Sequence, residues 1–314
     1  MSDRPLLTLA HSPDPDDAFM WWPITGKVPA SAMDRDRASV LSPPAIDTGR
    51  FRFRAVPGDI ETLNRRAAER ADLDITALSA RAYADAAAKY VITACGASFG
   101  DGYGPKVVCR ADAPLRCDGC LREQRPVIAV PGARTTAFLV LSLLVGARFD
   151  FVEMPFHRIV EAVAQGRVGA GLIIHEAQLT FQDAGLRQLV DVGAWWGEWT
   201  GLPLPLGLNA VRRDLDRRHG SGAIAEVAAT LRRSVAHANA HRAESLDYAM
   251  SFAMGNLHGP EGPPSPALVA RFVDMYVNRW TVDMGDAGRG AIARLLSEGA
   301  AAGLCTDPGP IETV

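Results

Sequence analysis

Two sequence patterns alternate along the first two thirds of this chain, and this alternation limits the fold more than any other feature. Short apolar runs rich in β-branched residues predict strands, and apolar residues at helical spacing predict helices between them. The predicted strands are 6–10, 51–56, 74–78, 90–94, 106–109, 127–130, 149–154, 171–174 and 189–192. The predicted helices are 60–70, 80–88, 135–145, 158–165 and 176–184. This order predicts an α/β fold with a largely parallel sheet and crossover helices.

The last third of the chain has a different pattern. Amphipathic helices without intervening strands are predicted at 223–241, 243–254, 267–277 and 288–302, and a Gly/Pro-rich turn is predicted at 259–264. Arginines on the outer faces of these helices are typical of a solvated surface. We therefore expect C-terminal helices that coat a sheet built by the earlier part of the chain.

Two segments rich in glycine and proline, 100–105 and 200–207, predict connections between two lobes. Glycine permits unusual dihedral angles and proline restricts them, which suits connectors that hold two lobes and still allow closure. The expected division is a large lobe from 1–112 and 206–314 with an inserted small lobe at 113–205. The polar, Pro-rich stretch 26–49 predicts a surface loop.

Charge and composition restrict the class of partner. The 33 basic and 36 acidic residues give a net charge of −3, so the chain as a whole offers no positive field for nucleic acid. The polar N-terminus and the early charges predict neither a signal peptide nor a membrane span, and we expect a cytoplasmic protein with a small-molecule partner. The odd set of five cysteines predicts reduced thiols, and the single CxxC at 117–120 lacks the second ligand pair that zinc needs.

Ligands of open α/β sheets gather beyond the carboxyl ends of strands, so the residues that follow each strand are the site candidates. After the first strand comes His-Ser-Pro-Asp-Pro-Asp-Asp at 11–17. We expect Ser12 and Asp14 to face a ligand, and Asp16 and Asp17 to cap a helix that opens at Ala18. A metal site at these aspartates lacks further ligands in the sequence.

A second candidate is Val-Pro-Gly-Ala-Arg-Thr-Thr-Ala at 130–137, where a strand turns sharply into a helix. Free N–H groups and a partial positive charge at the start of a helix form an anion receptor, and two hydroxyls add donors. Thr135 and Thr136 are therefore predicted to hold a carboxylate or phosphate. The alternative is that one threonine only caps the helix.

His175 ends the strand at 171–174 and precedes Glu176 at the start of a helix. The positive end of a helix disfavours imidazolium, so a neutral ring able to accept a proton is expected there. The alternative is a buried histidine that only satisfies the core. Asn64 and Ser79 are plausible hydrogen-bonding groups beside another strand end, although turn and helix positions explain them equally well.

Taken together in chain order, these motifs resemble one family, the 1,4-dihydroxy-6-naphthoate synthases of the futalosine route to menaquinone. The resemblance extends through nearly the whole chain. It is carried by Ser12-Pro13, Asp59–Asn64, Leu78-Ser79, Gly104-Pro105, Val130–Gly132 with Thr135–Ala137, Gly171–Glu176, Val190–Trp196, Thr200–Gly207 and Tyr276–Asn278. It implies a two-lobed fold like that of type II periplasmic binding proteins, with a central cleft.

The resemblance also implies a lyase-type activity that converts cyclic dehypoxanthinyl futalosine to 1,4-dihydroxy-6-naphthoate, without a metal or organic cofactor. It implies that His175 is the base that starts ring opening. The substrate would be lined by Thr135, Thr136, Asn64, Ser79 and Ile174. The carboxylate of the product agrees with the anion receptor expected at the two threonines.

Departures from the family pattern leave alternatives open. Many members have Ser-Pro-Cys-Pro-Asn-Asp where this chain has two further aspartates, Asp14 and Asp16, and His157 stands where an aspartate is common. A non-catalytic cytoplasmic protein that binds a small carboxylate on the same fold is one alternative. The chorismate-dehydrating enzyme of the same pathway is another, although the block at 172–176 fits the synthase better. The sequence predicts no oligomeric state.

Overall fold

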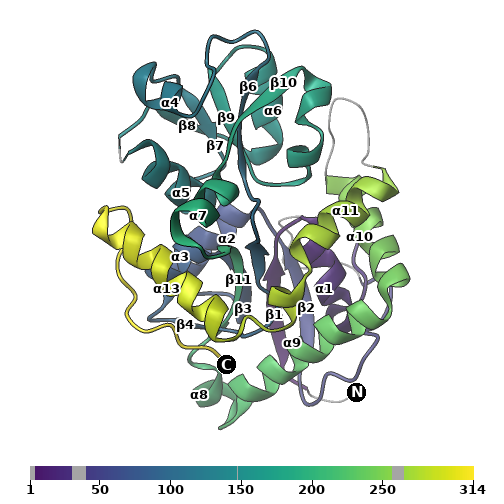
Figure 1. Cartoon of the computed structure of the whole chain (residues 1–314). Coiled ribbons are helices and arrows are strands. Elements are labelled where there is room, and N and C mark those ends of the chain that lie inside the picture. Colours follow the sequence, from purple (N-terminus) through teal and green to yellow (C-terminus); the bar gives the residue numbers. More distant parts are fainter. Residues whose placement is uncertain (1–3, 30–39, 147, 257–264) are drawn as a thin grey trace.

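The computed structural model describes residues 4–29, 40–146, 148–256 and 265–314. Residues 30–39 of the predicted surface loop and the whole predicted turn at 259–264 lie outside the described residues. Within the described part, the strands form two sheets, which Figure 1 shows one above the other. The chain enters the second sheet after residue 105 and returns to the first at residue 204.

The first sheet has the strand order β2-β1-β3-β11-β4, and β5 pairs with β11 beside this path. Its strands are β1 (Leu6–His11), β2 (Arg52–Pro57), β3 (Ile75–Ser79), β4 (Tyr90–Ile92), β5 (Ser98–Gly100) and β11 (Leu204–Arg212). β1 runs parallel to β2 and β3, whereas β11 runs antiparallel to β3, β4 and β5. Every residue of β3 is buried, as expected for a central strand covered by helices on both faces.

The second sheet has the strand order β10-β6-β9-β7-β8. Its strands are β6 (Lys106–Arg110), β7 (Ile128–Val130), β8 (Phe151–Glu153), β9 (Ala170–Ile173) and β10 (Leu186–Asp191). β7 runs parallel to β8 and β9, and β6 runs antiparallel to β9 and β10. The parallel strands β7 and β9 therefore direct their carboxyl ends to the same edge of the sheet, where the loops before α5 and after β9 begin.

Strand pairing corrects two predictions. The expected largely parallel sheet is instead two mixed sheets, because β6 and β11 link the sheets and run antiparallel to their neighbours. The segment 200–207 was predicted as a connector only, but its last four residues begin β11. Proline weakens a strand prediction because it cannot donate to the ladder. Pro205 is tolerated where the pairing between β11 and β5 is irregular.

Helices cover both sheets, and the C-terminal ones wrap the first sheet (Figure 1). The helices before β11 are α1 (Pro15–Thr25), α2 (Ile60–Arg65), α3 (Ala80–Ala86), α4 (Gly119–Glu123), α5 (Thr136–Val145), α6 (Ile159–Ala164) and α7 (Val192–Thr200). Those after it are α8 (Leu215–His219), α9 (Ala223–Ala240), α10 (Arg242–Asn256), α11 (Pro266–Tyr276), α12 (Arg279–Val282) and α13 (Gly285–Ala301). The predicted coat of C-terminal helices agrees with this arrangement. The segment 176–184, predicted as one helix, forms two short 3₁₀ turns.

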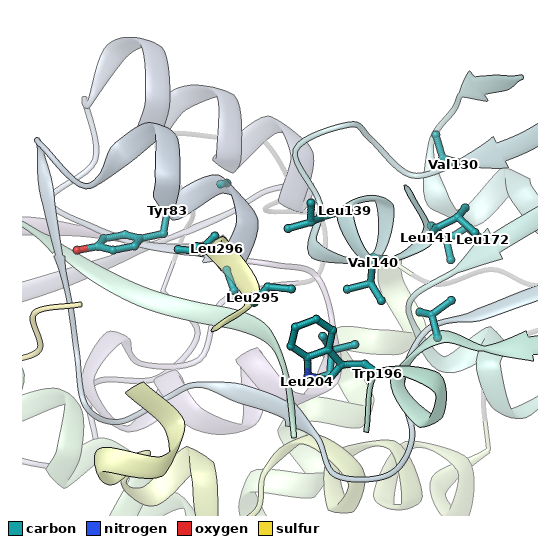
Figure 2. Close-up of a cluster of buried hydrophobic side chains, with 14 of the residues drawn as sticks. Tyr83, Val130, Leu139, Val140, Leu141, Leu172, Trp196, Leu204, Leu295 and Leu296 are labelled. Atoms are coloured by element: carbon teal, nitrogen blue, oxygen red, sulfur yellow. The ribbon is translucent and has the colours of Figure 1, made fainter. Parts of the chain in front are cut away.

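One cluster of buried side chains joins the two sheets (Figure 2). Tyr83 of α3 and Leu295 of α13 lie at one end, Val140 of α5 lies in the middle, and Leu172 of β9 lies at the other end. Each fully buried side chain of this size contributes about 1.5–3 kcal/mol. Because α5 lies in the middle of this cluster, its N-terminus is held firmly against both sheets.

The predicted lobe boundaries 1–112, 113–205 and 206–314 stay a prediction. The pairing of β6 within the second sheet suggests a first boundary near residue 105. The five cysteines form no disulfide, and the sulfurs of Cys117 and Cys120 lie 3.5 Å apart. None of the helices in the described part of the chain is long and apolar enough to cross a membrane.

Candidate functional site

A cavity of about 690 Å³, part of it open to solvent, is lined by segments attached to both sheets. The first sheet contributes the ends of β1 and β3 and the start of β11, and the second contributes the N-terminus of α5 and Ile174 after β9. The polar lining residues are Ser12, Asp14, Asp16, Asp17, Ser79, Ser98, Thr135, Thr136, Asn209 and Tyr276. No lysine, arginine or histidine is among the described residues that line the cavity. An anion in it must therefore be held by neutral donors.

The N-terminus of α5 supplies such donors through its backbone. Thr135 is the N-cap: its hydroxyl accepts from the Phe138 N–H at 3.2 Å and donates to the Gly132 carbonyl at 2.8 Å. The Thr136 hydroxyl donates to the Leu206 carbonyl and accepts from the Arg81 N–H. Both hydroxyl hydrogens are thus used within the fold, and contact of the two threonines with a ligand stays a prediction. Because Thr135 takes the Phe138 N–H, the first-turn N–H groups of Thr136 and Ala137 are the donors available to an anion.

Gly132 shapes the turn before α5. Its φ of 156° and its close approach to Glu61 both demand glycine, because an added Cβ would lie 2.5 Å from the Glu61 side chain. The Glu61 carboxylate in turn accepts from the Arg134 N–H at 3.2 Å. Burial raises the pKa of Glu61, and hydrogen bonds from Asn64 and Arg65 oppose this effect. The turn before α5 is thus fixed to α2, a helix that packs on the first sheet.

Asn64 and Ser79 lie together, but only Ser79 lines the cavity. The Asn64 amide donates to the Ser79 hydroxyl at 3.1 Å, and its carbonyl oxygen accepts from the Ser79 N–H at 2.8 Å. Asn64 is fully buried. The geometry gives Asn64 the task of positioning Ser79, and direct contact of Asn64 with a substrate stays a prediction.

The start of α1 brings three carboxylates to the cavity. Asp14, not Asp16 or Asp17, is the N-cap residue, and α1 begins at Pro15 instead of Ala18. Asp17 accepts from the Ser12 N–H at 2.8 Å, and Asp16 accepts from the Ser98 hydroxyl at 3.2 Å. The predicted N-cap position is therefore wrong, because Asp16 and Asp17 lie inside the first turn of α1, where Asp17 also accepts from Trp21 Nε1 at 3.3 Å. Ser12 and Asp14 line the cavity, and their contact with a ligand stays a prediction.

Burial and mutual repulsion raise the pKa values of Asp14 and Asp16. Burial raises the pKa of Asp14 well above its usual range, and the charges of Asp16 and Glu176 raise it further. Burial and the neighbouring Asp17 raise the pKa of Asp16 to about 7. One oxygen of Asp14, Oδ1, is buried without a hydrogen-bond partner. This end of the cavity is acidic but carries less negative charge at neutral pH than its composition implies.

His175 lies directly behind the cavity wall. It follows β9, its side chain is only 3% exposed, and its ring lies edge-on to Phe156 with 4.5 Å between ring centroids. The ring does not line the cavity, although the preceding Ile174 does. Its Nδ1 atom is buried and has no hydrogen-bond partner. The imidazole is thus a buried group with a free nitrogen, one residue away from the wall.

Burial lowers the pKa of His175, so the ring is neutral at pH 7. The charges of Glu176 and Asp59 oppose this effect, and His157 adds to it. The direction agrees with the prediction, but burial, not the helix terminus, is the main cause. The segment after His175 is tied to α11, since Gln178 donates from Nε2 to the Tyr276 hydroxyl at 3.1 Å.

Sequence reasoning missed three polar residues of the wall: Ser98, Asn209 and Tyr276. Ser98 begins the short β5, Asn209 lies within β11, and Tyr276 ends α11. The sequence predicts a connector at Thr200–Gly207, so it does not predict the strand that continues to Asn209. The pairing of β11 with β3 and β5 brings Asn209 and Ser98 to the site, and α11 brings Tyr276.

Comparison with known proteins supplies independent findings. A family model described as menaquinone biosynthesis matches residues 7–301. A 1,4-dihydroxy-6-naphthoate synthase of Thermus thermophilus is 41% identical over 304 residues, which is 97% of each chain. A synthase of the same name from Streptomyces coelicolor is 35% identical over 311 residues, covering 97% of this chain and 96% of that one.

Among solved structures, an alkanesulfonate-binding protein of Xanthomonas axonopodis superposes with a TM-score of 0.64 at 13% identity, covering 99% of this chain and 98% of that one. At this identity the likeness shows the fold alone. The α/β fold with two sheets is thus of the periplasmic-binding-protein kind, which confirms the predicted fold class.

Proposed function

We propose a role for His175 on the premise that this chain belongs to the menaquinone biosynthesis family and is an enzyme of its 1,4-dihydroxy-6-naphthoate synthase group. In this role His175 accepts the proton whose removal starts ring opening of cyclic dehypoxanthinyl futalosine. The observation that carries this proposal is the buried, unpartnered Nδ1 of a neutral imidazole beside the cavity. The predicted cytoplasmic location belongs to the same proposal.

The α5 N-terminus supports the binding half of the proposal. The substrate and the product both carry a carboxylate, and the first-turn N–H groups beside Thr135 and Thr136 are neutral donors at a partial positive charge. Ser79, held by Asn64, adds a hydroxyl at the neighbouring end of β3. We infer that the carboxylate lies against α5.

The surroundings of His175 support the proton-transfer half. A buried neutral imidazole is ready to accept a proton, and the charges of Glu176 and Asp59 favour the imidazolium once it forms. Because the ring lies behind Ile174, contact with the substrate requires a change at the end of β9 or a movement of the lobes. The bond between Gln178 and Tyr276 restrains this same segment.

The activity is tested by mixing purified protein with cyclic dehypoxanthinyl futalosine and following the products by mass spectrometry. We expect 1,4-dihydroxy-6-naphthoate to form without added metal or cofactor. Absence of this product from active, folded wild-type protein would refute the proposed substrate.

His175→Ala tests the assignment of the base. We expect the variant to fold and to bind substrate, but to react about 100-fold more slowly or worse, as is usual on removal of a general base. His241→Ala is the matched control, because His241 is an exposed residue at the end of α9. Equal turnover by His175→Ala would move the role to His11, the buried histidine beside Ser12.

A further inference from the structure

The cavity wall formed by α1, β5 and β11 carries polar groups that the proposed proton transfer does not use. Asn209 is 2% exposed and lines the cavity, and its Oδ1 atom is buried without a hydrogen-bond partner. Ser98 lines the same wall and donates its hydroxyl hydrogen to Asp16 at 3.2 Å. An unpaired buried acceptor costs about 1–3 kcal/mol, so its retention points to a ligand that donates to it.

The orientation of the Asn209 amide is fixed by its other contact. Its Nδ2 donates to the Gly96 carbonyl at 2.7 Å. A flipped amide would place two acceptors against each other, so the oxygen is the atom left unpaired. The backbone carbonyl of Asn209 is also held, since it accepts from the N–H and the hydroxyl of Thr93. The side chain therefore has little freedom to find another donor.

Two glycines keep space open around these groups. Gly96 has a φ of +80°, and an added Cβ would lie 2.7 Å from the Trp21 ring and 2.9 Å from the Asn209 amide nitrogen. Gly207 pairs with Ser98 across β11 and β5 and also lines the cavity. A Cβ on Gly207 would make only an ordinary contact, 3.7 Å from the Ser98 Cβ. A methyl group at Gly207 would thus fit the fold but would occupy ligand space.

The charges on this wall select among ligands. Asp14, Asp16 and Asp17 repel a phosphate or carboxylate, which belongs at α5 instead. A hydroxyl group can donate to Asn209 Oδ1 and can also accept from a protonated carboxyl, which a neutral aliphatic group cannot do. A polar, uncharged, hydroxyl-bearing group matches the wall best.

We propose that Asp16, Ser98 and Asn209 form a subsite for neutral hydroxyl groups, so that the substrate lies with its carboxylate at α5 and its hydroxyl-bearing part at β5 and β11. The orientation rests on the proposed function, whereas the preference for hydroxyl groups rests on the geometry alone. The pKa of Asp16, raised to about 7 by burial and by Asp17, supports a carboxyl that is neutral part of the time and can donate a hydrogen bond.

The test uses three ring carboxylates that differ only in their substituents: quinate with its hydroxyls, cyclohexanecarboxylate without any, and trans-4-aminocyclohexanecarboxylate with an ammonium group. Calorimetry on the full chain gives each Kd. We expect quinate to bind about 10-fold tighter than cyclohexanecarboxylate, as two net hydrogen bonds would provide. Ser98→Ala and Gly207→Ala should each reduce this preference to about 3-fold or less, because they weaken the binding of quinate more than that of cyclohexanecarboxylate.

Ser251→Ala is the matched control, because Ser251 is an exposed residue of α10 whose hydroxyl donates to the Tyr248 carbonyl, and it should keep the full preference. Equal affinity for the three acids, a preference for the ammonium compound, or an equal loss for all ligands in the variants would overturn the subsite. Because no turnover is measured, failure of the proposed function is seen separately, as absence of naphthoate from wild-type protein that still prefers quinate.

Discussion

The helices α1 and α5 both begin at the cavity just after a strand, yet they present opposite chemistry to a ligand. α5 begins with two threonines whose hydroxyls are used in the fold, which leaves uncharged backbone donors at the wall. α1 begins with Asp14, Asp16 and Asp17 in the same position relative to its strand. A helix N-terminus is thus an anion site only where its first turn carries no carboxylate of its own.

The difference gives the cavity a direction. A carboxylate is favoured at α5 and disfavoured at α1. Ser79 lines the cavity at the end of β3, and His175 follows the end of β9. The hydrophobic cluster that holds α5 also fixes this polarity, because α5 cannot shift without disturbing the core that both sheets share.

The largest effect is expected when the N-terminus of α5 is given a carboxylate like those at the start of α1. Thr135→Asp keeps an efficient N-cap but adds a negative charge where the substrate carboxylate is expected. We expect the Kd for 2-naphthoate, measured by calorimetry, to rise about 100-fold with little change in stability. Thr135→Ser is the control and should bind like wild type. An unchanged Kd in Thr135→Asp would show that no anion binds at α5.

A second prediction concerns the stability of the acidic end. The pKa of Asp16 is raised to about 7 in the fold, so its contribution to stability is fully present below the unfolded pKa and is lost as pH rises toward 7. Asp16→Asn removes this loss, and we expect the variant to be more stable than wild type by roughly 2 kcal/mol at pH 8.

Urea unfolding at pH 5 and pH 8 measures this effect, with a smaller difference between variant and wild type expected at pH 5. Asp286→Asn, at an exposed position of α13, should show no such pH dependence. A variant that is less stable than wild type at pH 8 would mean that burial of the ionised Asp16 carboxylate does not destabilise the fold.

Asp14→Asn has the smallest expected effect. Burial raises the pKa of Asp14, so wild type and variant carry the same charge at low pH and should bind 2-naphthoate equally at pH 5. As pH rises and Asp14 ionises, the variant should bind about 3-fold tighter, because a negative charge has been removed from the cavity. Equal binding at pH 5 and at pH 9 would show that the acidic end does not act on the ligand.

The sequence predicted the strands better than their pairing. Each predicted strand overlaps an observed one, because apolar β-rich runs mark buried strands directly. The direction of β11 and the separation into two sheets depend on contacts far apart in the chain, which no local pattern encodes. The prolines before Gly207 concealed β11, since proline disfavours a central strand.

The site shows the same division. Ser12, Asp14, Ser79, Thr135 and Thr136 were predicted from strand ends, Ile174 was implied by the family resemblance, and all six line the cavity. Asn209 and Ser98 were not predicted, because a polar residue inside a strand gives no local sign of the cavity it faces. The capping error at Asp16 and Asp17 has a similar cause, since their partners, Ser98 and the loop at Ser12, are fixed by tertiary contacts.

The pH dependence of kcat/KM for cyclic dehypoxanthinyl futalosine, measured for wild type and His175→Gln, tests the central claim most directly. Because the pKa of His175 is lowered by burial, the wild-type rate should be level above about pH 6.5 and fall only in more acidic solution. We predict that His175→Gln loses this acidic limb together with about 100-fold of the rate. A variant that keeps both the rate and the limb would contradict proton acceptance by His175.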